Sequence, residues 1–189
     1  MKHHFYIRKG IHLISGYIII WICRYVNLAT YILAFWILLV VLIDIARYYI
    51  PWWNKQFSRI FGNYLKPSEK YGGLTGASTL WAGLYLLYLI FPKDVFYPAA
   101  LVMVFSDAMA AIFGRHFAFY TFSNSKTIGG SLMFVFSTVL IFRYSNIPLI
   151  MAFPVAIILS SLEFFWRGSL ENFALGFGGA LSLSILKIL

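Results

Sequence analysis

Long apolar runs follow one another along almost the whole chain, separated by short polar breaks, and this pattern limits the possible folds more than any motif does. Only 11% of the 189 residues are charged and 61% are hydrophobic, whereas about 25% of the residues in a soluble domain are charged. In lipid, only helices and closed barrels satisfy every backbone polar group, and apolar runs of about 20 residues suit helices. The sequence therefore predicts an all-α integral membrane protein.

The polar breaks divide the chain into about seven transmembrane helices and one amphipathic interfacial segment. The amphipathic segment, residues 51–69, mixes aromatic and aliphatic residues with Lys and Arg, as in helices that lie in the membrane interface. We see no internal repeat, low-complexity tract or linker, so we expect a single polytopic domain over residues 1–189. The expected spans are residues 10–27, 28–49, 74–91, 95–113, 128–142, 147–165 and 173–189.

The basic residues predict the orientation of these spans. With a cytoplasmic N-terminus, eleven of the fifteen basic residues fall on the cytoplasmic side, as the positive-inside rule requires. We therefore expect a multi-pass membrane protein whose N-terminus and active site are cytoplasmic. In a prokaryote it would lie in the cytoplasmic membrane. Loop charge and contact with anionic lipid account for the net charge of +9 without a nucleic acid as partner.

Five of the six acidic residues fall at or near the cytoplasmic side. Acids within apolar runs usually line a site or a water-filled cavity. Asp107 has no basic residue one turn before it, so it is the acid most in need of a cation. Asp44 and Arg47 are three residues apart, and Glu163 and Arg167 are four apart, which is the spacing of structural ion pairs on a helix. The two other acids on this side are Glu69 and Glu171.

The stretch 105–131 combines an acid, a face of small residues and a lysine. The small residues follow Asp107 at helical spacing, so another helix can approach them closely. A polar loop then leads to Lys126. An acid that binds Mg²⁺, beside a lysine and loop N–H groups that bind phosphate oxygens, suits a metal-bound phosphate. Taken singly, either residue is better explained by its place at a membrane boundary. The small residues are Ala110, Ala111 and Gly114.

Six short polar motifs follow one another along the chain. Their residues and their order resemble those of a known family. They are R-K-x-x-H at Arg8, Lys9 and His12; D-x-x-R at Asp44 and Arg47; residues 66–77 with Glu69; D-x-x-A-x-x-x-G-R from Asp107 to Arg115; K-T-x-x-G-S at Lys126, Thr127, Gly130 and Ser131; and E with E-N at Glu163, Glu171 and Asn172. Together they resemble the membrane lipid kinases that include dolichol kinase, phytol kinase and the CTP-dependent diacylglycerol kinases.

Three positions depart from the pattern of that family. Gly129 stands where many members have Glu, Ala118 where many have Gly, and Glu171 where many have Asp. The change at 171 keeps a carboxylate. The change at 129 removes one, so we assign no acid to the lysine motif.

The resemblance implies transfer of the γ-phosphoryl group of CTP to a membrane lipid alcohol, with Mg²⁺ as cofactor and CDP as product. Residues 66–77 resemble phytol kinases most, which favours an isoprenoid alcohol of the phytol, polyprenol or dolichol type. The implied catalytic residues are Asp107, Lys126 and Glu163, and the implied metal ligands are Asp107 and Glu171. The implied nucleotide and phosphate ligands are Arg115, Lys126, Thr127, Gly130, Ser131 and Asn172. Further pocket residues would be Arg8, Lys9, His12, Asp44, Arg47 and Glu69.

Other functions stay open at this point. A diacylglycerol kinase would use the same donor with another alcohol. A nucleotidyltransferase like the phosphatidate cytidylyltransferases would release pyrophosphate in place of CDP. A small transporter or scaffold would catalyse no reaction. It would not explain why the acids and Lys126 are expected at one membrane face. Assembly into a homo-oligomer and the identity of a general base also stay open.

Overall fold

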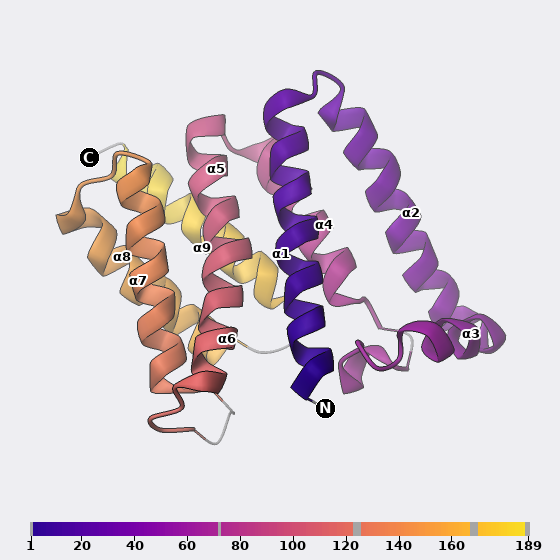
Figure 1. Ribbon diagram of the computed structural model, residues 1–189. Coiled ribbons are helices and arrows are strands. Elements are labelled where there is room, and N and C mark those ends of the chain that lie inside the picture. Colours follow the sequence, from indigo (N-terminus) through magenta and orange to yellow (C-terminus); the bar gives the residue numbers. More distant parts are fainter. Residues whose placement is uncertain (1, 72, 123–125, 167–169, 188–189) are drawn as a thin grey trace. The chain divides into compact units, whose positions relative to one another are not determined.

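The computed structural model describes residues 2–71, 73–122, 126–166 and 170–187. Within these ranges every regular element is a helix, and the only strand-like feature is an isolated bridge between Thr121 and Thr127. The prediction of an all-α chain is therefore confirmed for the described residues (Figure 1). The elements are α1 (Lys2–Tyr25), α2 (Ala29–Tyr49), α3 (Pro51–Phe61), the 3₁₀ turn η1 (Pro67–Glu69), α4 (Gly76–Ile90), α5 (Lys93–Leu101), the π-helical turn η2 (Val102–Ser106), α6 (Asp107–His116), α7 (Ile128–Tyr144), α8 (Leu149–Phe165) and α9 (Glu171–Leu186).

The chain divides into two compact units, Met1–Tyr85 and Leu86–Leu189, and the boundary falls within α4. The first unit holds α1 to α3 and the start of α4, and the second holds α5 to α9. The single polytopic domain expected from the sequence stays a prediction.

Each expected span corresponds to a helix, but the helices differ in their fitness to cross a membrane. In the described part of the chain two are long and apolar enough: α2, and the continuous helix Lys93–His116 that α5, η2 and α6 form together. The apolar helices α4, α7 and α8 are shorter, with 15, 17 and 17 residues. The two long helices favour membrane association. The number of seven spans and the orientation stay predictions.

The first unit contains an apolar helix, α2, with few buried residues. In α2 only Ala29, Leu33, Ile37, Asp44 and Arg47 are buried, although the helix has 21 residues and is apolar almost all round. A helix with apolar residues on every face needs a non-aqueous surrounding, and lipid would supply it.

The amphipathic segment of residues 51–69 begins with a helix. Pro51 starts α3, a position where its fixed φ suits the first helical turn. None of the eleven described residues of α3 is buried, and Trp52 and Trp53 lie at its surface. This arrangement agrees with a helix that lies along an interface.

The second unit is built around one interrupted helix. In chain order α6 packs on α7, α7 on α8 and α8 on α9, and α5 packs on α9. The wide turn η2 interrupts the regular α-helix immediately before Asp107. Such π-helical turns often occur at functional sites in proteins. The fully buried apolar side chains of the unit include Phe96, Met103, Phe134, Leu159 and Leu175.

Candidate functional site

Three acidic side chains from three helices meet in the second unit. Asp107 is the first residue of α6, Glu163 lies near the end of α8, and Glu171 is the first residue of α9. One carboxylate oxygen of each lies within 4.8 Å of the others. Asp107 and Glu163 are buried, and Glu171 is half-buried. The structure therefore brings together three acids that the sequence places far apart, and we call this set the acid cluster.

The packing of α7, α8 and α9 explains why the acids meet. Residues 145–148 join α7 to α8 directly, so the two helices run antiparallel and the start of α7 lies at the same end as the end of α8. Because α9 packs on α8 and starts soon after it, its first turn lies at that end too. A carboxylate in the first turn, such as that of Glu171, is also favoured by the helix dipole.

Lys126 links two of these acids. Its ammonium donates to Glu163 Oε1 and to Glu171 Oε1, the latter at 2.8 Å. Burial disfavours the ammonium charge, but the two carboxylates outweigh this effect and hold the pKa of Lys126 above its usual value. The lysine therefore carries its positive charge and balances part of the negative charge of the acid cluster.

A close contact between α6 and α7 holds Lys126 beside the acids. The Thr127 hydroxyl donates to the Gly114 carbonyl at 3.1 Å and accepts from the Gly130 N–H at 3.1 Å, so it caps α7 and bonds α6 at once. A Cβ added at Gly114 would lie 2.5 Å from Thr127 Oγ1, and one at Gly130 would lie 2.9 Å from the Ala110 carbonyl oxygen. The small-residue face predicted after Asp107 is thus the face on which α7 approaches.

The remaining predicted phosphate ligands differ in what surrounds them. The N–H of Gly130 bonds the Thr127 side chain, and the N–H of Ser131 bonds the Thr127 carbonyl at 3.1 Å. These two donors therefore serve the start of α7 in this structure. Arg115 is exposed at the end of α6. Asn172, the residue after Glu171, is half-buried. Their binding of a nucleotide stays a prediction.

The predicted ion pairs have separate outcomes. Asp44 and Arg47 form the expected pair, with 2.9 Å between Oδ1 and NH1. Arg167, the expected partner of Glu163, lies outside the described residues, and Glu163 instead bonds Lys126. The sequence offered no local signal for that second contact, because 37 residues separate its partners.

The other predicted pocket residues lie in the first unit. Arg8, Lys9 and His12 are half-buried in the first half of α1, and Glu69 is buried in η1. Their membership of a ligand pocket stays a prediction.

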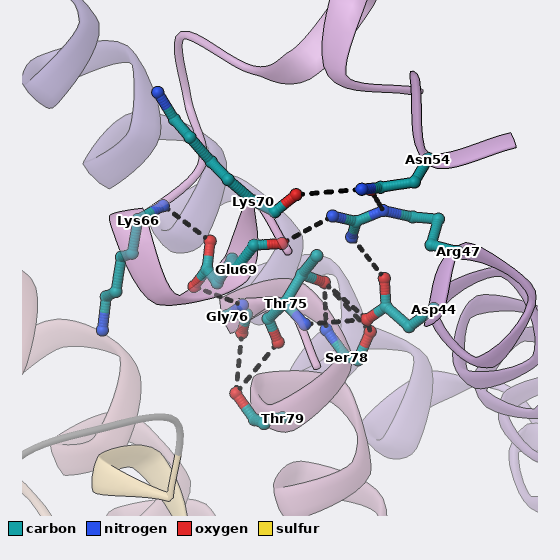
Figure 2. Close-up of polar contacts among 10 residues, drawn as sticks. All are labelled: Asp44, Arg47, Asn54, Lys66, Glu69, Lys70, Thr75, Gly76, Ser78 and Thr79. Atoms are coloured by element: carbon teal, nitrogen blue, oxygen red, sulfur yellow. Dashed lines mark hydrogen bonds and ion pairs between the residues drawn. The ribbon is translucent and has the colours of Figure 1, made fainter. Parts of the chain in front are cut away.

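Two polar contacts near the predicted residues were missed by the sequence analysis. Thr138 on α7 donates to Ser106 at 3.0 Å, so a buried hydroxyl bond joins α7 to the residue before Asp107. Thr75 and Ser78 both bond Asp44 (Figure 2). The available signal for the second contact was the pair of hydroxyls, Thr75 and Ser78, three residues apart at the start of an apolar run.

An apolar groove of about 300 Å³ runs between α7 and α8. Its lining includes Ser160 and Phe164, which flank Glu163 along α8, and Ile128 and Ser131 in the first turn of α7. The groove therefore lies at the end of the two helices where Glu163 and Lys126 meet.

Comparisons with known proteins found partial similarity to two curated proteins. Over 108 residues the chain is 29% identical to the uncharacterized protein RP860 of Rickettsia prowazekii, covering 54% of this chain and 52% of that protein. Over 91 residues it is 25% identical to CTP-dependent diacylglycerol kinase 1 of Schizosaccharomyces pombe, covering 47% and 41%. The chain thus spans about half the length, or less, of these relatives. No family model and no solved structure matches.

Proposed function

We propose that this chain is a membrane lipid kinase that transfers the γ-phosphoryl group of CTP to a lipid alcohol. The observation that carries the proposal is the meeting of Asp107, Glu163, Glu171 and Lys126 at one end of the second unit. The partial similarity to a CTP-dependent diacylglycerol kinase supports the same class of reaction.

The acid cluster fits a hard divalent cation. Carboxylate oxygens are the protein ligands that Mg²⁺ prefers, and the three side chains lie close enough to share one ion. Asp107, Glu163 and Glu171 would hold it. When bound, Mg²⁺ neutralises charge on the phosphate oxygens during phosphoryl transfer.

Lys126 has the chemistry to exchange partners. Its ammonium carries three donors on a flexible stem, and two of its contacts in the structure are to carboxylates. The phosphates of a nucleoside triphosphate also carry negatively charged oxygens. The ammonium can therefore turn from the carboxylates to the phosphates and keep an ionic contact throughout. The exposed guanidinium of Arg115 on α6 would add a second cation for the phosphates.

The apolar groove would hold the part of the lipid chain nearest the hydroxyl. Its lining residues Ser160 and Phe164 flank Glu163 along α8, so a hydroxyl at that end of the groove would approach the acid cluster while the rest of the lipid stays in the bilayer. We place an isoprenoid alcohol first among the acceptors, because residues 66–77 resemble phytol kinases. Diacylglycerol is second, because the curated kinase that matches carries that name.

The full chain, purified in lipid nanodiscs, tests the proposal. It is mixed with Mg²⁺, γ-labelled CTP and one alcohol at a time: phytol, geranylgeraniol, a polyprenol or diacylglycerol. We expect labelled lipid monophosphate and CDP, and we expect Asp107→Asn to form neither. The matched control is Asp94→Asn, which alters an exposed acid whose partner is Lys187. A parallel sample holds phosphatidate in place of the alcohol, and release of pyrophosphate there would identify a nucleotidyltransferase. A chain that neither binds nor turns over nucleotide would exclude both enzymes.

A further inference from the structure

A second polar cluster lies in the first unit, buried at the end of α2 (Figure 2). Asp44 and Arg47 are 3% and 1% exposed, so their charges are almost fully removed from solvent. Burying charged groups costs stability unless each one is paired and hydrogen-bonded. The partners of these two side chains therefore indicate what the pair does.

Asp44 acts on the start of α4. Its Oδ2 accepts from the Thr75 N–H at 2.8 Å, from the Thr75 hydroxyl at 3.0 Å and from the Ser78 hydroxyl. The Thr75 hydroxyl also accepts from the Ser78 N–H at 3.3 Å, as an N-cap side chain does. An anion near a helix N-terminus is favoured by the helix dipole. Asp44 thus caps α4 from another helix.

Arg47 acts on the connection between α2 and α4. Its NH1 bonds Asp44, its NH2 donates to the Glu69 carbonyl at 2.7 Å, and its Nε donates to Asn54 Oδ1 at 3.3 Å. Its guanidinium also lies 4.1 Å from the ring centre of Phe57 on α3. Each of its three nitrogens therefore has an acceptor within the protein.

The connection closes through three further bonds. Asn54 on α3 donates to the Lys70 carbonyl at 3.0 Å. The Glu69 carboxylate accepts from the Lys66 N–H at 2.9 Å and from the Gly76 N–H at 3.1 Å. Figure 2 shows these bonds joining the end of α2, α3, the turn around Glu69 and the start of α4.

We infer that Asp44 and Arg47 form a clasp that closes the connection between α2 and α4 and sets the start of α4, and that they do not bind nucleotide, metal or lipid. The clasp consists of Asp44, Arg47, Asn54, Glu69, Thr75 and Ser78. Both oxygens of Asp44 and all three nitrogens of Arg47 are engaged inside it. This inference concerns the first unit and stands whether or not the proposed function is correct.

Hydrogen exchange of the full chain in nanodiscs tests the clasp through the peptides that cover residues 66–79. We expect Asp44→Asn and Arg47→Met each to speed exchange there about tenfold or more, because each leaves a buried charge without its partner. The double variant removes both charges, so we expect it to exchange no faster than the faster single variant. Rate increases that multiply in the double variant would overturn the inference. So would unchanged exchange in a single variant that has lost nucleotide or Mg²⁺ binding.

A milder pair of variants keeps the test sharp if a charge change prevents folding. Ser78→Ala removes a hydroxyl that bonds Asp44, whereas Thr79→Val removes the next hydroxyl along α4, which bonds only carbonyls of its own turn among the contacts described. Both side chains are 2% exposed. We expect Ser78→Ala to speed exchange at residues 66–75 about fivefold, the effect of one buried hydrogen bond, and Thr79→Val to change it less than about twofold. Equal effects at 66–75 would overturn the inference.

Discussion

Lys126 and Glu171 lie 45 residues apart in the sequence, and the ammonium of one meets a carboxylate oxygen of the other at 2.8 Å. The same ammonium bonds Glu163. One cation thus balances two of three acids that lie within 4.8 Å of one another. This contact offsets the repulsion between neighbouring carboxylates. The stability of the acid cluster therefore depends on a positive charge beside it, either that of Lys126 or that of a bound cation.

The first prediction concerns stability and metal together. We expect Lys126→Ala to lower the free energy of unfolding by about 2 kcal/mol, because neighbouring carboxylates lose a partly buried partner. Mg²⁺ should restore part of the loss, and it should raise the melting temperature of the variant more than that of the wild type. Thermal unfolding with and without Mg²⁺ measures both effects.

The control for this prediction is Lys187→Ala. Lys187 bonds an exposed acid, Asp94, and exposed ion pairs contribute little to stability. A Mg²⁺ response in Lys187→Ala as large as that in Lys126→Ala would contradict a metal site at the acid cluster.

The second prediction concerns nucleotide binding. Lys126→Ala should weaken CTP binding about tenfold or more, because one charge-assisted contact to phosphate is lost. Lys126→Arg should recover binding only in part, since its planar fork replaces a compact ammonium. Calorimetric titration with CTP gives both affinities. Wild-type affinity in Lys126→Ala would leave the lysine as a structural residue alone.

The third prediction concerns Asp107. Asp107→Asn keeps the size of the side chain and removes its charge, so the chain should fold while Mg²⁺ binding weakens at least about tenfold. Titration with Mn²⁺ as a spectroscopic substitute measures the binding. The acid cluster would not be the metal site if the variant bound Mn²⁺ as the wild type does and Asp94→Asn behaved identically.

The fourth prediction concerns the approach of α7 to α6. Gly130→Ala would place a Cβ 2.9 Å from the Ala110 carbonyl oxygen, so we expect a loss of about 1–3 kcal/mol of stability through overpacking. Gly10→Ala is the matched control, because a Cβ there meets nothing within 4 Å. Gly10 lies inside α1, where Ala is favoured over Gly by about 0.5–1 kcal/mol. In thermal unfolding we therefore expect Gly130→Ala to lower the melting temperature and Gly10→Ala to raise it.

The fifth prediction concerns topology. In a Cys23→Ala background, which lacks the one natural cysteine, single cysteines replace Tyr120 and Lys187. We expect an impermeant thiol reagent to label them from opposite sides of the membrane, with Tyr120→Cys on the cytoplasmic side. Labelling of both from the same side would contradict the predicted orientation.

The sequence predicted the helices well because apolar periodicity and polar breaks are local signals. The expected span 28–49 became Ala29–Tyr49, and the expected span 128–142 became Ile128–Tyr144. The helix α1 begins at Lys2, before the expected span of residues 10–27. Charged residues such as Arg8 and Lys9 ended the apolar pattern, but they do not end a helix.

The sequence singled out the residues that meet in the acid cluster, but not the contacts between them. Helical spacing correctly paired Asp44 with Arg47, since that contact is local. The bond from Lys126 to Glu163 depends on how α7 and α8 pack, which no spacing within one helix reveals. For the same reason the hydroxyls that bond Asp44 were missed, because they belong to Thr75, just before α4, and to Ser78 in its first turn.

The wide turn η2 has a consequence for how the chain tolerates changes in length. A π-helical turn accommodates one residue more than the α-helix it interrupts, and each residue of an α-helix turns the chain by about 100°. Loss of one residue within Val102–Ser106 would therefore yield an ordinary helix with Asp107 still facing the acid cluster. Loss of one residue between Asp107 and Gly114 would instead rotate Gly114 away from α7 relative to the carboxylate. Insertions and deletions between related sequences should accordingly gather before Asp107 and avoid the turns after it.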